Sequence, residues 1–203
     1  MTAHMSGGSG ELVLHEAHVQ GVARRDPDAL ASCYEALADP LYRYVRGLCG
    51  DPTLAEDLVE ETFLELVQAA PQLTGGVGGL RAWLFRAARN NLIDAKRKIA
   101  RHGNVPLDEV VIGLRPDTDP GPEAVAVMRE REAILQEAMA ELSDDQREVL
   151  LLRFAVGMSG PEVAAATDRT VGAVKSLQHR GLAAMARILG TDPGLEAGLR
   201  DDP

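Results

Sequence analysis

The chain has 203 residues, a formal net charge of −10, 45% hydrophobic residues and only 3% aromatic residues. This length accommodates one or two domains, and cores rich in Ala and Leu are typical of helices. Cys33 and Cys49 are too few for a disulfide framework and have no metal-ligand cluster beside them. No apolar run reaches the length of a membrane span and no signal segment opens the chain, so we expect a cytoplasmic protein with reduced thiols and no membrane insertion.

Two helices are predicted in the first quarter of the chain. The first covers residues 11–24. The second begins at Asp26, a preferred helix-capping residue, followed by Pro27 at the first helical position. The apolar spacing then predicts a helix that is broken near Pro40 and ends near Gly50.

The next predicted helix, over residues 51–70, is strongly acidic. It carries six Asp and Glu residues and no Lys or Arg through Glu65, a local charge of −6. Such a helix is unsuited to binding phosphates itself. A solvated face, a surface for a protein partner and a neutralising neighbour of a basic helix remain open. The acids that stand out are Glu56, Asp57, Glu60 and Glu61.

Residues 81–101 have the opposite character. Seven Lys and Arg stand against one acid, Asp94, a local charge of +6 within an acidic protein. At 100° per residue the apolar side chains share one side of a helix: Leu84, Ala88, Leu92, Ala95 and Ile99. The opposite side carries the cations and one amide: Arg86, Arg89, Asn90, Lys96, Arg97 and Arg101. Concentrated positive charge is typical of a polyphosphate-binding surface, with a solvated face as the alternative.

Aromatic residues mark the beginning of this basic helix. Trp83 is the only tryptophan and Phe85 is one of three phenylalanines, and both follow a glycine-rich loop over residues 71–79. Rings beside cations suit unstacked bases, because a base stacks on the ring while arginine holds its phosphate. An anchoring role for Trp83 in the core fits the sequence equally well.

The last part of the chain predicts a second group of helices. Four prolines over residues 103–122 indicate a linker that cannot continue a helix. A helix is then predicted over residues 127–142. Ser143 caps the next helix, which has acids in its first turn, and Gly157 closes it.

Two further helices with a tight turn between them form a helix-turn-helix pattern. Ser159 caps the first, the chain turns at Asp168, and Thr170 caps the second. The row expected to face inward is Val171, Val174, Gln178, Leu182 and Met185. The residues expected to face outward or to flank this helix are Arg169, Thr170, Gly172, Ala173, Lys175, Ser176, His179 and Arg180. Small and polar residues with flanking cations suit a helix in a major groove, and an ordinary surface helix is the alternative.

These segments carry a resemblance to a known family. Residues 81–98, with their Trp-Leu pair, their Arg-Asn pair and an Asp followed by basic residues, resemble the minus-ten melting region of bacterial sigma-70 family factors. The form is that of the small extracytoplasmic-function (ECF) group. Residues 142–154, 159–167 and 172–189 are similar, in order and spacing, to the carboxy-terminal domain of these factors. Thr167 and Asp168 stand where the family often has Leu and Gly.

The resemblance implies an all-α fold of two small helical domains joined by a flexible linker, the second with a helix-turn-helix. The expected divisions are a disordered amino-terminus (1–10), a region 2-like domain (11–102), the linker (103–123), a region 4-like domain (124–190) and a tail (191–203). It implies a factor that binds core RNA polymerase and directs promoter recognition, strand opening and transcription initiation.

The resemblance also assigns roles to residues. The acidic helix would bind the β′ clamp of core RNA polymerase through Glu56, Asp57, Glu60 and Glu61, and the β flap is a further expected contact. Minus-ten DNA, partly single-stranded, would meet Trp83, Arg86, Arg89, Asn90, Asp94, Lys96, Arg97 and Arg101. Duplex minus-thirty-five DNA would meet Arg169, Thr170, Gly172, Ala173, Lys175, Ser176, His179 and Arg180. An anti-sigma factor is an expected partner.

The alternatives to a polymerase-dependent factor are a free-standing regulator and an enzyme. A free-standing helix-turn-helix regulator would bind a palindromic duplex tightly without polymerase, whereas the acidic net charge suits a factor that binds DNA only inside a larger complex. An enzyme would need a catalytic constellation. The five histidines are scattered, and the chain has no glycine-rich phosphate loop and no nucleophile-base pairing. We therefore expect no catalytic residue, no metal site and no cofactor.

Overall fold

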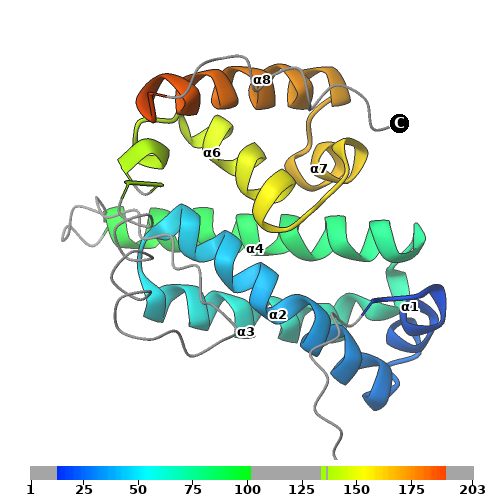
Figure 1. Ribbon diagram of the computed structural model, residues 1–203. Coiled ribbons are helices and arrows are strands. Elements are labelled where there is room, and N and C mark those ends of the chain that lie inside the picture. The colour runs from blue at the N-terminus through cyan, green and yellow to red at the C-terminus, as the bar shows by residue number, and fades with distance from the viewer. Residues whose placement is uncertain (1–12, 102–133, 136, 191–203) are drawn as a thin grey trace, which may run out of the picture.

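The structure is a computed structural model that describes residues 13–101, 134–135 and 137–190. The amino-terminal half contains α1 (Glu16–Ala23), α2 (Pro27–Cys49), α3 (Pro52–Ala69), the short 3-10 helix η1 (Ala70–Gln72) and α4 (Gly76–Arg101). The carboxy-terminal half contains α6 (Asp144–Leu150), the π-helical turn η2 (Leu151–Ala155), α7 (Gly160–Thr167) and α8 (Val171–Ile188). No strand occurs among the described residues, so the prediction of an all-α fold with two helical regions is confirmed (Figure 1). The predictions for residues 1–10, 103–123 and 191–203, and for half of the helix over 127–142, lie outside the described residues.

The predicted helix starts are present with their capping hydrogen bonds. Asp26 accepts a hydrogen bond from the Ala29 backbone nitrogen at 3.0 Å, and Asp51 accepts one from Thr53 at 2.9 Å. Each is followed by a proline at the first helical position, whose missing N–H would have no partner there. The four predicted caps, Asp26, Ser143, Ser159 and Thr170, therefore hold their helices, and Asp51 does the same at the start of α3.

Three helix boundaries differ from the prediction. Residues 13–15 are not helical and α1 begins at Glu16, whose side chain accepts a hydrogen bond from Val77 at the start of α4. Helix α2 continues through Pro40 without a break, because buried residues along its whole length hold it against its neighbours and outweigh the one backbone hydrogen bond that proline removes. Helix α4 begins at Gly76, so most of the predicted glycine-rich loop belongs to helices.

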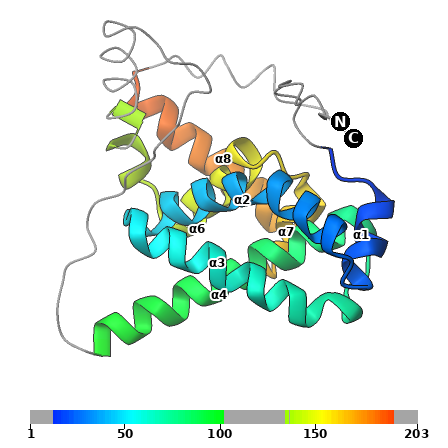
Figure 2. The same cartoon turned by 90° about the horizontal axis from the view of Figure 1, so that it is seen from below.

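Helix α4 lies at the centre of the fold. In Figure 1 it runs between α2 and α3 on one side and α6, α7 and α8 on the other, and Figure 2 shows α1 beside its beginning. Phe85 of α4 is fully buried, and its ring packs edge-to-face against Tyr44 of α2 with centroids 5.4 Å apart. Aromatic pairs favour this geometry because the edge of one ring is positive and the face of the other negative.

The two helical halves share one continuous hydrophobic core. Helix α7 packs against α4, and η2 packs against α2. The two halves approach closely at Gly47, where a Cβ atom would lie 2.9 Å from a methyl carbon of Leu151. A larger residue at this position would therefore require the Leu151 side chain to shift.

The turn between α7 and α8 depends on a residue in the left-handed region. Asp168 has φ 55° and ψ 46°, and its position lets the Arg169 nitrogen donate to the Ala164 carbonyl at 2.9 Å. Asp tolerates this conformation better than most residues, whereas a β-branched side chain is strained by it. Asp168 thus supplies the turn at a place where the family often has glycine.

We expect Asp168→Val to lower the free energy of unfolding by about 1–2 kcal/mol, because valine clashes with the backbone at positive φ. Urea denaturation followed by circular dichroism measures this. Asp168→Gly is the control and should stay within about 0.5 kcal/mol of the original protein, because glycine adopts this conformation freely. Equal stability of all three proteins would contradict the left-handed turn.

Candidate polymerase and nucleic-acid interfaces

Helix α8 presents a polar face to solvent. Lys175, Ser176, His179 and Arg180 are exposed and line a shallow, open hollow on the surface. Thr170 and Gly172 are also exposed, while Arg169 and Ala173 are half-buried. Most of the residues predicted to face outward therefore do so.

The buried side of α8 differs from the predicted row. Val174, Leu177 and Gly181 are buried, whereas Val171 is 39% exposed. The buried stripe follows positions three and four residues apart starting at Val174. The expectation that Val171 packs inward is wrong, and Leu177 was missed although it lies three residues after Val174, where the helical period places an inward neighbour.

Arg169 at the beginning of α8 has a carboxylate partner. Its guanidinium lies 2.6 Å from a carboxylate oxygen of Asp145 in the first turn of α6. The ion pair joins the helix-turn-helix to α6 and partly neutralises the cation. Arg169 therefore helps to orient α8, and it also places a positive charge near any bound phosphate.

The predicted basic face of α4 divides into two groups. The solvent-exposed group consists of Arg86, Asn90, Asp94, Arg97 and Arg101. Asp94 and Arg97 form an ion pair of 3.2 Å within the helix, in which both side chains remain mostly exposed. Such a pair is easily exchanged for another partner, since exposed ion pairs contribute little to stability.

The second group is engaged with other parts of the fold. Lys96 donates to the Leu48 carbonyl at 3.1 Å, near the end of α2. Arg89 lies 2.7 Å from a carboxylate oxygen of Glu148 in α6. The prediction that Arg89 and Lys96 lie on the solvent face beside Arg86 and Arg97 is therefore wrong, because both side chains contact neighbouring elements.

The two aromatic residues of α4 have different surroundings. Phe85 is fully buried and belongs to the core. Trp83 is half-buried and packs against the core with part of its ring accessible. Only Trp83 is thus placed where a base could reach it.

Helix α3 separates its acids from its core residues. Glu56, Asp57, Glu60 and Glu61 are all exposed, and no ion pair between described residues involves them. Leu64, one turn further on, is 66% exposed. The sequence reading did not single out Leu64, although it lies off the buried row of α3 and next to the acids. The surface combines negative charge with an accessible apolar side chain.

A buried polar cluster joins the two halves. The Tyr44 hydroxyl of α2 donates to Glu148 Oε1 at 3.0 Å, and Arg89 of α4 pairs with the same oxygen. Burial raises the pKa of the Glu148 carboxyl, and the Arg89 guanidinium opposes that shift. Burial together with Glu148 raises the pKa of Tyr44 well above its ordinary value. Sequence reasoning missed this cluster, because its members are too far apart in the chain for any periodicity to relate them.

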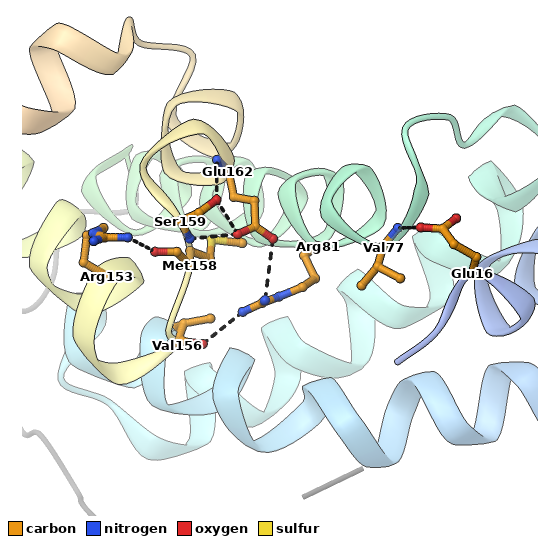
Figure 3. A network of polar contacts seen from close by, with 8 residues as sticks. All are labelled: Glu16, Val77, Arg81, Arg153, Val156, Met158, Ser159 and Glu162. Atoms are coloured by element: carbon orange, nitrogen blue, oxygen red, sulfur yellow. Dashed lines mark hydrogen bonds and ion pairs between the residues drawn. The ribbon is translucent and has the colours of Figure 1, made fainter. Parts of the chain in front are cut away.

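A second polar contact joins α4 to the loop before α7 (Figure 3). One guanidinium nitrogen of Arg81 lies 3.5 Å from Glu162, and another donates to the Val156 carbonyl at 3.0 Å. Glu162 also accepts from the Ser159 backbone nitrogen at 2.7 Å and so completes the cap of α7. The start of α7 and the start of α4 are therefore held together by the same carboxylate.

Other kinds of site are not found in the described part of the chain. It holds no group of three or more metal-ligating side chains. Cys33 and Cys49 are both buried, and burial raises the pKa of the Cys33 thiol to about 11, which keeps it protonated and unreactive. None of the described helices is both long and apolar enough to cross a membrane.

A helix-turn-helix together with a basic helix is typical of DNA-binding proteins, and comparison with known proteins specifies the family. Residues 33–102 match the family model of sigma-70 region 2, and residues 132–185 match that of sigma-70 region 4. The ECF RNA polymerase sigma factor SigL of Mycobacterium tuberculosis is 32% identical over 173 residues, which are 85% of this chain and 96% of SigL. The ECF RNA polymerase sigma factor BldN of Streptomyces coelicolor is 30% identical over 167 residues, which are 82% of this chain and 62% of BldN.

The fold agrees with a solved structure. The sigma factor RpoE in complex with the anti-sigma factor NepR from Bartonella quintana aligns with a TM-score of 0.64 at 24% identity, over 80% of this chain and 97% of RpoE. The chain therefore belongs to the ECF sigma factors of the sigma-70 family, whose members regulate transcription. It binds RNA polymerase and directs transcription initiation at promoters.

Proposed function

We propose that α8 reads the minus-thirty-five element from the major groove and that α4 contacts the minus-ten element as its strands separate. The observation that carries this proposal is the exposed face of α8, where small residues at the helix start adjoin Lys175 and Arg180. Residues 124–190 would form the minus-thirty-five domain, residues 11–102 the polymerase-binding and minus-ten domain, and residues 103–123 the linker. The protein would act as a non-catalytic specificity subunit in the cytoplasm.

The geometry of α8 supports the first half of the proposal. Val174 and Leu177 hold the helix against its own half, so Gly172, Lys175 and Ser176 face away from it. Gly172 has nothing within 4 Å of where its Cβ would be, so bases could approach the backbone closely. Ala173, Thr170, His179 and Arg169 complete the proposed contact set.

The exposed group on α4 supports the second half. Arg86, Asn90, Arg97 and Arg101 share the outward side, with Asp94 among them, and Trp83 lies near the start of the helix. Arginines can hold the phosphates of a displaced strand while a half-accessible ring stacks on a base. Arg89 and Lys96 would join these contacts after leaving their present partners.

Protein partners are proposed from the other surfaces. The exposed acids Glu56, Asp57, Glu60 and Glu61 with Leu64 would bind the β′ clamp of core RNA polymerase, and the carboxy-terminal half would meet the β flap. The solved relative from Bartonella quintana is bound to an anti-sigma factor. We extend this to the present chain and propose that an anti-sigma factor regulates it.

We expect Lys175→Ala and Arg180→Ala to change the preference for particular upstream bases by about 1–3 kcal/mol each, the usual size of a good base contact. Assembled holoenzyme should be tested by run-off transcription on promoters mutated base by base. Arg187→Ala is the matched control, because Arg187 is an exposed cation in the last turn of the same helix.

Two results would change the assignment. If the variants bind all promoters more weakly by the same factor, and the salt dependence falls by about one unit per charge removed, these side chains contact phosphates and do not read bases. Unchanged preference at every upstream base would remove α8 from sequence reading. Tight binding to a palindromic duplex without polymerase would favour a free-standing regulator instead.

A further inference from the structure

We propose that Val171, the first residue of α8, reads a thymine in the minus-thirty-five element through contact with the thymine methyl group. The inference rests on the proposed function of α8, and it adds a side chain that lies outside the contact set named above. It also specifies one base of the promoter, since thymine alone presents a methyl group in the major groove.

Val171 lies on the face of α8 that points away from the protein. The exposed residues of this helix recur at intervals of four, in a row of Val171, Lys175, His179, Ala183 and Arg187 beside a row of Gly172, Ser176 and Arg180. Residues four apart share one face of a helix. The valine, which is 39% exposed, therefore begins the row that contains Lys175, one of the proposed base contacts.

The position of Val171 distinguishes it from other exposed apolar residues, which are common singly on protein surfaces. All of α8 belongs to the described part of the chain, and Val171 is its one exposed large apolar side chain. It stands between Thr170 and Gly172, which are both exposed. Apart from its own stretch of helix, nothing lies within 4 Å of where a Cβ of Gly172 would be. DNA can therefore approach the backbone closely and bring its base edges to the valine.

The hydroxyl groups nearest to Val171 are engaged within α8. Thr170 Oγ1 accepts a hydrogen bond from the Ala173 nitrogen at 3.2 Å and so caps the helix. Ser176 Oγ donates its one hydrogen to the Gly172 carbonyl at 3.0 Å. An apolar contact with Val171 leaves both of these hydrogen bonds in place. The start of α8 is thus suited to an apolar group on the DNA.

The chemistry of the major groove selects thymine as that partner. Guanine, cytosine and adenine present hydrogen-bond donors and acceptors there, whereas thymine also presents a methyl group. A donor or acceptor covered by valine would lose water without gaining a partner, which is unfavourable. A methyl group gains from being covered, because apolar surface is removed from water. Val171 therefore favours thymine and disfavours the other three bases.

Val171 is held in place before DNA binds. Valine has one strongly preferred side-chain rotamer in a helix. Its Cγ1 atom lies 4.0 Å from where a Cβ of Gly160 would be, so α7 begins beside it. A side chain with few conformations loses little entropy when an interface buries it. The contact should therefore give nearly the full effect of burying one methyl group, which is about a fourfold preference.

The test uses core RNA polymerase assembled with the full-length chain, and a promoter selected from a random library by run-off transcription. Each thymine of the upstream element is replaced in turn, on either strand, by deoxyuridine, which lacks the methyl group and keeps the base pair. We expect one such replacement to weaken closed-complex binding about fourfold in gel-shift titration. Val171→Ala should bind the thymine and deoxyuridine promoters equally, and Val171→Ile should retain the preference.

Leu189→Ala is the matched control, because Leu189 is also 39% exposed and directly follows α8. This variant should keep the fourfold effect, and circular dichroism should show the same helicity for all variants. The role of Val171 is overturned if the selected upstream element holds no A·T pair, or if deoxyuridine has no effect at any position. It is also overturned if Val171→Ala stays as sensitive to deoxyuridine as the original protein.

The proposed function of α8 is tested separately, with Lys175→Ala and Arg180→Ala on the same promoters. If these variants change base preference while deoxyuridine has no effect, α8 reads the element and only the role of Val171 fails. If neither a change in base preference nor a methyl effect is found, α8 does not read sequence and both proposals fail.

Discussion

Replacing Asp57 and Glu61 with lysine is expected to abolish co-purification of the protein with core RNA polymerase. Both side chains are exposed on α3 and lack ion-pair partners among the described residues, so the change alters the surface charge by four units without disturbing the core. A complementary basic surface would become repulsive, and like charges brought together across an interface cost several kcal/mol. Affinity pull-down with purified core enzyme measures the loss.

The matched control reverses Glu137 and Glu141, which are exposed and have the same four-residue spacing in the other half of the chain. This variant should still co-purify, and circular dichroism should show equal helicity for both proteins. Undiminished binding by the α3 variant would place the polymerase interface elsewhere. If both variants lose binding, polymerase binding depends on the net charge of the protein and not on the α3 surface.

Removal of Arg86 and Arg97 together is expected to reduce strand opening by about 30- to 150-fold, with a much smaller effect on the first, closed promoter complex. The estimate follows from the loss of two contacts worth about 1–1.5 kcal/mol each. Permanganate reactivity of unpaired thymines measures opening, and gel-shift titration of holoenzyme measures the closed complex. Arg89 is left in place, because its removal would leave the buried Glu148 carboxylate without its cationic partner and so disturb the fold.

The control removes Arg24 and Arg187, two exposed arginines outside α4. It matches the lost charge and should preserve opening. If the α4 variant loses closed-complex formation and strand opening equally, Arg86 and Arg97 act only as general phosphate contacts.

Local features of the fold could be predicted because their causes are local. Asp51 followed by proline, and the capping residue Thr170, place helix starts wherever the rest of the chain lies. The helix-turn-helix follows from such signals, and the exposed face of α8 follows from helical periodicity.

Long-range features could not be predicted. The continuation of α2 through Pro40 depends on the burial of Leu37 and Leu41 before and after the proline, whereas local propensity indicates a break there. The position of Arg89 depends on Glu148, which comes from a different half of the chain. Periodicity assigns a side chain to a face of its helix, but it does not say whether another element covers that face.

The close approach at Gly47 has a consequence for the evolution of these factors. A residue there with a side chain would meet the methyl groups of Leu151, which would have to move for α2 and η2 to keep their contact. A single codon, far from every proposed DNA contact, can therefore alter how the two halves pack. Selection can thus adjust that packing and leave promoter preference intact.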